Sequence, residues 1–222
     1  MTRQTTAPCE CPSCKKTTEV QIWSSINVML HPEMRRNVLD GSAFEFVCPS
    51  CGARERLAYA CLYHDQQESF MVYWVPAAEQ DKAETLAMLE NIPIPMPGYR
   101  RRIVTSRNRL REKILLFERG VDDRVIEVMK RIVWDAYLRD KGVAADEMYF
   151  DGVSGTPTAP DIELTILHAS GQEPTKITIP AQAGYPVAYR ILHEKFNVPT
   201  EHSPEWRLVD HTYMSEAEQG RG

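Results

Sequence analysis

The sequence predicts an α+β protein with a small β module, a helical hairpin packed on it, and a C-terminal α+β section. Three observations lead to this class. Two Cys-Pro-Ser-Cys turns, at 11–14 and 48–51, lie among short runs of β-branched and aromatic residues. Two consecutive segments in the middle repeat apolar residues at helical spacing. Strand and turn signals then alternate after residue 143.

The two Cys-Pro-x-Cys turns, here called the first knuckle (11–14) and the second knuckle (48–51), can bring four thiolates to one point. A stretch of 33 residues separates them, and Gly52 follows the second. Four thiolates form the closed tetrahedral shell of a structural zinc ion. The sequence therefore predicts a zinc-ribbon-like β module with one structural Zn²⁺. The expected ligands are Cys11, Cys14, Cys48 and Cys51.

The cysteines leave alternatives open. A lone Cys-x-x-Cys can act in thiol–disulfide exchange, so redox chemistry is an alternative, although two copies at this spacing favour metal binding. Cys9 lies two residues before Cys11 and is an alternative ligand, but the turn geometry favours Cys11. Cys61 has no cysteine at ligand spacing and is expected to be a buried apolar residue. Because four thiolates close the shell and lower the Lewis acidity of the metal, we expect it to hold the fold.

Composition is that of an ordinary soluble globular protein, with 222 residues of which 43% are hydrophobic. The net charge of −5 does not favour non-specific binding to nucleic acid. Residues 1–8 lack the apolar stretch of a secretory signal, and no apolar run approaches the roughly 18 residues of a membrane span. Four of the six cysteines lie in Cys-x-x-Cys pairs, so we expect a cytoplasmic protein in a reducing compartment.

The first third of the chain is expected to be mostly strand. Residues 1–8 should form a flexible arm, and 17–30 a strand rich in β-branched and aromatic side chains. Pro32 suits the first position of a short helix that Gly41 ends. Further strands are expected at 44–47, 54–63 and 69–75.

The middle of the chain is expected to be helical. Residues 79–91 indicate a surface helix, and the alternate prolines of 92–98 an extended connector. After a basic strand at 99–104, Ser106 and Asp122 can cap the two helices of the hairpin. These helices should cover 107–118 and 122 to about 139.

The last third should form the C-terminal α+β section. Pro186 is expected to begin a helix that reaches Phe196, the segment 202–213 should pack on the body, and 215–222 should be a flexible tail. Strands are expected at 148–150, 162–168 and 176–179. The expected domains are 9–140, which binds the metal, and 143–214, which either is separate or completes the first.

Charge is distributed unevenly along the chain. Residues 100–131 hold 11 Lys/Arg and 5 Asp/Glu, whereas 132–222 hold 7 and 14. The two stretches either complement each other within the chain or give a basic surface for an acidic partner. The arginine-rich stretch 100–111 is the best candidate for nucleic-acid binding, but only Tyr99 is near enough to stack on a base. Its arginines are at 100–102, 107, 109 and 111.

One histidine adjoins an acid, at His64 and Asp65. Such a pair can supply a general base. Adjacent residues on a strand point to opposite faces, so a structural hydrogen-bonding role is favoured. No phosphate loop, nucleophile elbow or dinucleotide fingerprint occurs in the chain.

The order of these motifs resembles the CpXC domain of bacterial proteins. Beyond both knuckles and Gly52, the matching segments are 23–27 (Trp-Ser-Ser-Ile-Asn), 31–33 (His-Pro-Glu), 40–41 (Asp-Gly) and 63–65 (Tyr-His-Asp). The resemblance is clear over 9–75 and weaker to about 140. It implies a bacterial protein with presumed zinc binding, in a family whose biochemical activity is uncharacterised.

Together these features lead us to expect a bacterial cytoplasmic, zinc-stabilised interaction module without evident catalysis, whose partner is another protein. One alternative is a nucleic-acid-binding or regulatory module that uses residues 100–111. Another is an enzyme that uses His64 and Asp65.

Overall fold

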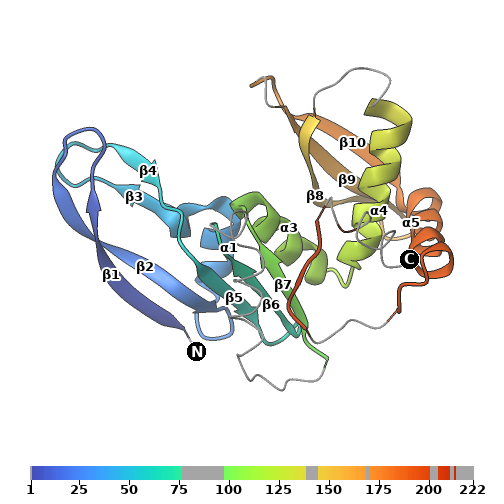
Figure 1. The fold of residues 1–222 in the computed structure, drawn as a ribbon, viewed down its shortest axis with the longest axis horizontal. Helices are drawn as coiled ribbons and strands as arrows, with labels where there is room; N and C mark the ends of the chain where they lie inside the picture. The colour runs from blue at the N-terminus through green and yellow to red at the C-terminus, as the bar shows by residue number, and fades with distance from the viewer. Residues whose placement is uncertain are drawn as a thin grey trace, which may run out of the picture. The chain divides into compact units, whose positions relative to one another are not determined.

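The computed structural model describes residues 2–76, 98–138, 145–168, 171–200, 205–210 and 213. The protein is α+β, as the sequence predicts. Its chain divides into two compact units. Figure 1 shows the ribbon coloured by residue number, from blue at the N-terminus to red at the C-terminus. The first unit comprises Met1–Arg111 and Pro204–Arg207, and the second comprises Glu112–Ser203 and Leu208–Gly222.

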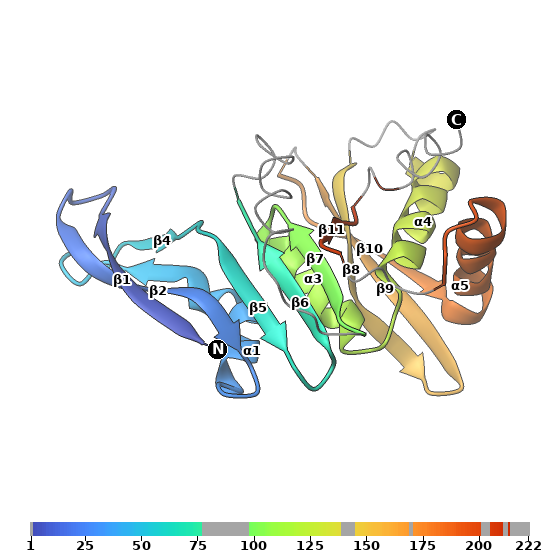
Figure 2. The ribbon, with the colours of Figure 1, turned by 60° about the horizontal axis from the view of Figure 1, so that its bottom comes forward.

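The first unit is built on a six-stranded mixed sheet in the order β1-β2-β5-β6-β7-β11. The pairs β1–β2 and β5–β6 are antiparallel, whereas β2–β5 and β6–β7 are parallel. Figure 2 shows β5, β6 and β7 side by side. The strands are β1 (Arg3–Glu10), β2 (Thr17–Asn27), β5 (Cys61–Asp65), β6 (Phe70–Trp74), β7 (Arg100–Val104) and β11 (Arg207–Leu208).

A separate antiparallel hairpin in this unit consists of β3 (Glu45–Val47) and β4 (Arg54–Arg56). The first knuckle connects β1 to β2, and the second connects β3 to β4. Each knuckle is therefore the end of an antiparallel hairpin, which fixes where its two cysteines point.

The predicted short helix is present as α1 (Glu33–Asp40), preceded by Pro32 and ended by Gly41 at φ 89°. Met34 and Val38 lie on its buried side. A 3₁₀ turn, η1 (Ser42–Phe44), then leads into β3. The ring of Phe44 packs edge-on against Trp74 of β6, with the two ring centroids 4.7 Å apart. This contact anchors the turn between α1 and β3 to the sheet.

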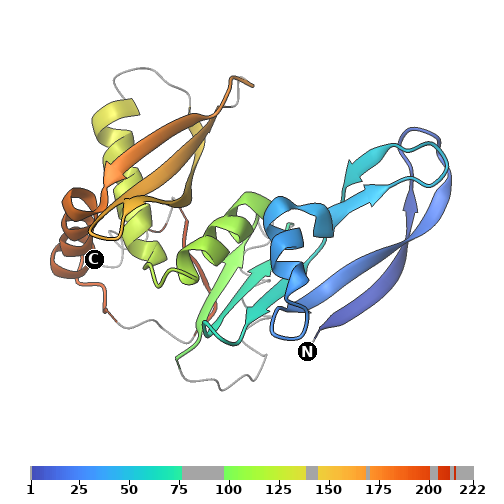
Figure 3. The same cartoon turned by 180° about the vertical axis from the view of Figure 1, so that it is seen from behind.

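The second unit contains a three-stranded antiparallel sheet in the order β10-β9-β8. In β9, Ile162, Leu164 and Ile166 are buried while the residues between them are more exposed, the alternation of a sheet covered on one face. The helix α5 packs on β9, β10 and α4, as Figure 3 shows. The bounds are β8 (Ala145–Thr156), β9 (Ala159–His168), β10 (Thr175–Pro180), α4 (Asp123–Val133) and α5 (Ala181–Arg190). π-Helical turns η2 (Trp134–Leu138) and η4 (Ile191–Lys195) extend the two helices.

Both predicted caps of the helical hairpin are confirmed. In α3 (Arg107–Phe117), which spans the boundary between the units, the Arg109 amide donates to Ser106 Oγ at 3.3 Å. In α4, the Arg124 amide donates to Asp122 Oδ1 at 2.9 Å. These bonds satisfy amides that have no partner within the helix.

The expected flexible arm at 1–8 is wrong, because Arg3–Glu10 form β1 and pair with β2 throughout. Residues 3–6 are exposed, so the strand has no apolar alternation there. Hydrogen bonding to the backbone of β2 orders β1 instead. The residues of β1 alone do not reveal that β2 is their partner.

Several other boundaries differ from expectation, and two of them change how the chain is organised. The single strand expected at 54–63 is two strands in different sheets, β4 and β5. Between them, the Tyr59 hydroxyl accepts the Trp23 amide and donates to the Ala43 carbonyl, both at 3.3 Å, which holds the crossover. Helix α5 begins at Ala181, with Pro186 inside it and not at its start.

The C-terminal segment returns to the first unit as expected. Trp206 is buried there against Met71, Tyr99 and Ile103. The helix expected at 79–91, the connector at 92–98 and the tail at 215–222 lie outside the described residues.

Candidate metal centre

The two knuckles share the same pattern of backbone hydrogen bonds. The Cys11 carbonyl accepts the Lys15 amide at 2.9 Å, and the Cys48 carbonyl accepts the Gly52 amide at 2.9 Å. The Cys11 amide donates to the Lys16 carbonyl at 3.0 Å, and the Cys48 amide donates to the Ala53 carbonyl at 2.8 Å. The residue directly after the second cysteine has positive φ in both, 60° at Lys15 and 73° at Gly52. Two similar turns therefore present two thiols each from the ends of two hairpins.

These turns bring the four predicted ligands together. The Sγ atoms of Cys11, Cys14, Cys48 and Cys51 all lie within 4.8 Å of one another. The Sγ–Sγ distance is 3.6 Å between Cys11 and Cys51 and 3.7 Å between Cys14 and Cys48. Zinc–sulfur bonds of about 2.3 Å place the corners of a tetrahedron about 3.8 Å apart. The four thiols therefore fit one tetrahedral metal ion.

The centre is covered on one side only. Cys11 and Cys48 are 0% and 2% exposed, Cys14 is half-buried, and Cys51 is exposed. Phe46 of β3 packs against the two buried cysteines, with Val20, Ala53 and Leu57 around it. Figure 1 shows the hairpin ends that carry the knuckles next to each other. The buried pair ties the centre to a small apolar cluster, while the other pair faces solvent.

The close sulfurs strongly affect one another's proton affinity. Hydrogen bonds, first from the Ser50 amide, lower the pKa of Cys48 to about 6 despite its burial. At Cys51 the Ala53 amide lowers the pKa, but partial desolvation of the sulfur and the three neighbouring sulfurs outweigh it and raise the pKa to about 12. Four thiolates this close repel one another, and a cation among them removes that repulsion. Metal binding at this centre must therefore release protons and weaken in acid.

The remaining cysteines lie outside this set. The Sγ of Cys9 lies 3.9 Å from the Glu10 carbonyl oxygen, and its side chain packs at the edge of the apolar cluster. Cys61 is 1% exposed in β5, and burial raises its pKa to about 12. The expectation that Cys61 is a buried apolar residue is confirmed.

His64 and Asp65 have separate partners in the structure. His64 Nε2 lies 3.4 Å from the Tyr99 hydroxyl, and burial lowers the pKa of His64. Asp65 Oδ1 accepts the amides of Gln67 and Glu68 at 3.0 and 3.1 Å, which closes the turn from β5 to β6. These contacts give both side chains structural roles.

Asn27 is a structural residue whose role was not predicted. It is 3% exposed, its Oδ1 accepts the Met29 amide at 3.0 Å, and its Nδ2 donates to Gln66 Oε1 at 3.1 Å. One side chain thus clamps the turn after β2 to the turn after β5. The only signal for it in the sequence was its place in the motif at 23–27.

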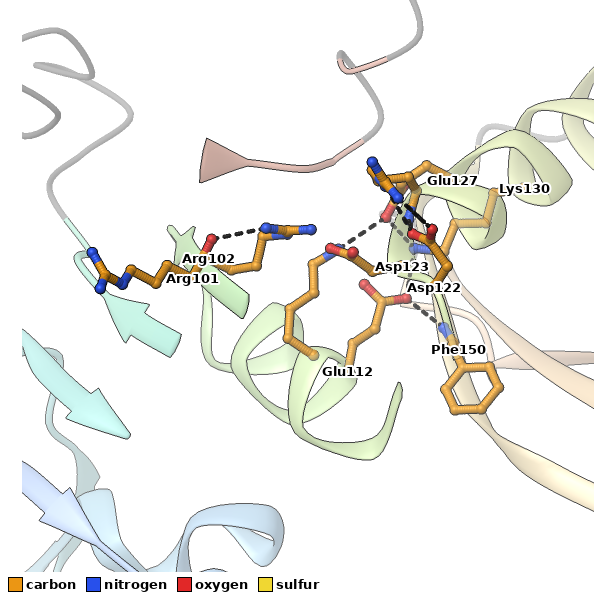
Figure 4. A network of polar contacts seen from close by, with 10 residues as sticks. Arg101, Arg102, Glu112, Asp122, Asp123, Glu127, Lys130 and Phe150 are labelled. Carbon is orange, nitrogen blue, oxygen red and sulfur yellow. Dashed lines mark hydrogen bonds and ion pairs between the residues drawn. The ribbon is translucent and has the colours of Figure 1, made fainter. Parts of the chain in front are cut away.

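The arginine-rich stretch 100–111 is not a uniformly exposed basic surface. Arg101 and Arg102 are 7% and 1% exposed, and Arg102 Nη1 donates to the Arg101 carbonyl at 2.9 Å (Figure 4). Arg107 lies against Gly41 at the end of α1. Buried guanidinium groups cannot contact phosphate, which weakens this stretch as a nucleic-acid surface.

A buried network of charged side chains in the second unit was also not predicted (Figure 4). Lys113 Nζ lies 3.0 Å from Asp123 Oδ2 and 3.6 Å from Glu127 Oε1. Lys130 Nζ lies 2.9 Å from Glu127 Oε1 and also pairs with Glu112. Every one of these side chains is buried, so the two lysines compensate carboxylate charge that burial would otherwise make costly.

The fold is α+β, and its four-cysteine cluster can hold a metal ion and is compatible with a zinc-ribbon-like module. The chain belongs to the CpXC family, whose model, described as "CpXC protein", matches residues 9–130. No curated protein and no solved structure matches the chain. Among the described residues, no helix has the length and apolar character needed to cross a membrane.

Proposed function

We propose that this chain is a bacterial cytoplasmic protein-interaction module whose fold depends on one structural Zn²⁺, with Cys11, Cys14, Cys48 and Cys51 as ligands. The observation that carries the proposal is the convergence of four thiols, from two matching turns, within 4.8 Å.

The donor set supports zinc in a structural role. Thiolate ligands in tetrahedral arrangement suit zinc or iron. Four of them leave no position for water or substrate, so the metal would join the two hairpins and would not activate a nucleophile. In zinc-finger peptides the binding free energy is about 10–16 kcal/mol, enough to decide whether a small module folds.

An apolar turn supports the interaction role. Met29 and Leu30 follow β2 and are 66% and 60% exposed, although both are large hydrophobic residues. The turn is rigid, because Asn27 accepts the Met29 amide through its side chain and the Leu30 amide through its carbonyl at 3.1 Å. A pre-ordered apolar pair loses little entropy when another protein covers it.

Native mass spectrometry with elemental analysis, on protein purified without chelator, tests the metal. We expect one zinc per chain and no alkylation of the four knuckle cysteines, with Cys9 reacting. A metal-free chain with all knuckle thiols reactive, or a chain loaded with iron, would contradict the zinc assignment.

Site-specific photo-crosslinking in bacterial cells tests the interaction surface. A photoreactive residue at Leu30 should give a discrete adduct with another protein, and the same residue at the exposed Glu55 of β4 should not. The interaction role fails if neither position gives an adduct, or if both positions give adducts in equal amount.

A further inference from the structure

The four sulfurs of the centre lie close together, and two of their contacts each join one more accessible and one buried sulfur. Cys51 is exposed, and its Sγ lies 3.6 Å from the fully buried Cys11. Cys14 is half-buried, and its Sγ lies 3.7 Å from Cys48, which is 2% exposed. Each pair takes one thiol from each knuckle, and the two pairs together use all four ligands.

From this arrangement we propose that the centre is a thiol switch. A peroxide-class oxidant joins Cys51 to Cys11 and Cys14 to Cys48 as disulfides, and the metal is released. The switch rests on the proposed structural metal and adds a means of regulating it.

The reaction begins at the accessible sulfur. Cys51 is a thiolate while it is a zinc ligand. This thiolate attacks one peroxide oxygen, the O–O bond breaks, and the products are a sulfenic acid and hydroxide. The Cys11 thiolate then attacks the sulfenic sulfur, so that the S–S bond forms, the S–O bond breaks and a second hydroxide leaves. Two thiolates lose two electrons and one peroxide gains them. The same steps at Cys14 and Cys48 consume a second peroxide.

The buried partners limit how far the oxidation proceeds. Cys11 is shielded from the oxidant but already touches the sulfur that becomes oxidised, so it traps the sulfenic acid before further oxidation. Thiolates are the metal ligands, so the first disulfide removes two of the four ligands and releases the ion. The disulfides span 40 and 34 residues and join the same two knuckles as the metal. The hairpins therefore stay tied together after oxidation, in contrast to removal of the metal by chelation.

Cys9 is the competing thiol. It packs at the edge of the same apolar cluster but does not belong to the group of four. Cys9→Ser therefore leaves the ligand set complete and removes the fifth thiol, which makes it the matched control.

The test is a hydrogen peroxide titration of the zinc-loaded full chain. Zinc release is followed with a chromogenic chelator, and disulfides are mapped by mass spectrometry of non-reduced peptides. We expect complete release by two peroxides per zinc, peptides linked through Cys11–Cys51 and Cys14–Cys48, and reversal by reductant plus zinc. The Cys9→Ser variant should give the same release and the same map.

Three results would overturn the switch: disulfides within a knuckle, a dominant disulfide through Cys9, or retention of zinc after two equivalents. The zinc content before oxidation separates this failure from that of the proposed function. A chain purified without metal contradicts the structural zinc, while its disulfide map under the same oxidant still shows whether the cysteines pair across the knuckles.

Discussion

At the scale of single residues, the two knuckles differ at one informative position. Both need a residue with positive φ directly after the second cysteine, and the second knuckle has Gly52 there while the first has Lys15. A side chain costs about 1–2 kcal/mol in this conformation because its Cβ approaches the following carbonyl oxygen. The first knuckle therefore carries strain that the second avoids.

Replacing Lys15 with glycine should raise the free energy of unfolding of the zinc-loaded protein by about 0.5–1 kcal/mol, since relief of the strain exceeds the added flexibility of the unfolded chain. Lys16→Gly is the matched control, because Lys16 has no positive φ, and it should lower stability instead. Gly52→Ala should cost about 1–2 kcal/mol. Urea unfolding measures all three, and equal effects at positions 15 and 16 would contradict the strain argument.

Gly41 has a second requirement besides its φ of 89°. A Cβ at this position would lie 1.9 Å from Arg107 Nη1 and 2.8 Å from its Cζ. Gly41→Ala should therefore cost about 2–3 kcal/mol, from backbone strain and from displacement of the guanidinium. In an Arg107→Ala background the same change should cost only the strain, about 1–2 kcal/mol. A double-mutant cycle by thermal unfolding measures the difference, and full additivity would show that the close contact is unimportant.

At the scale of elements, the sequence predicts what is local and misses what depends on a distant partner. The caps at Ser106 and Asp122 and the end of α1 at Gly41 follow from short-range hydrogen bonding and backbone preference. The convergence of the four cysteines was predictable because a turn fixes two cysteines at a time. The strand β1 was missed because its order comes from β2, and the charged pairs of α3 and α4 were missed because a buried lysine looks like a surface lysine in sequence.

The buried lysine of α3 allows a test of those pairs. Lys113→Met removes a cation that lies 3.0 Å from Asp123 and 3.6 Å from Glu127 in a region closed to water. The negative charges of the two buried carboxylates are then less well balanced by positive charge. We therefore expect the free energy of unfolding to fall by about 3 kcal/mol or more.

The matched control is Lys176→Met in β10. Lys176 also lies near an acid, at 3.3 Å from Asp151, but its side chain is 70% exposed. Its loss should cost at most about 1 kcal/mol, because water screens the pair. Similar costs at both lysines, measured by urea unfolding, would show that the network in the second unit contributes no more than a surface pair.

At the scale of the whole molecule, the proposed metal and the apolar core should support different parts of the chain. The hairpins β1–β2 and β3–β4 end in the knuckles, and beside the cysteines their cluster has one buried aromatic ring, Phe46. Burial of one such side chain contributes about 1.5–3 kcal/mol, far less than the binding free energy of structural zinc. The second unit has its own sheet and helices, with Phe150, Leu164 and Leu192 fully buried.

Removal of zinc should therefore loosen the chain locally. Hydrogen exchange with and without chelator, followed by mass spectrometry, should show at least tenfold faster exchange for peptides from β1 to β4 and little change for β8–β10. The tenfold limit corresponds to a loss of only about 1.4 kcal/mol, well within what the metal supplies. The Cys9→Ser variant should respond like the natural chain, and Cys48→Ser should exchange rapidly without chelator. Equal acceleration in both units would mean that the metal supports the whole fold, and no acceleration would mean that the apolar cluster alone holds the knuckles.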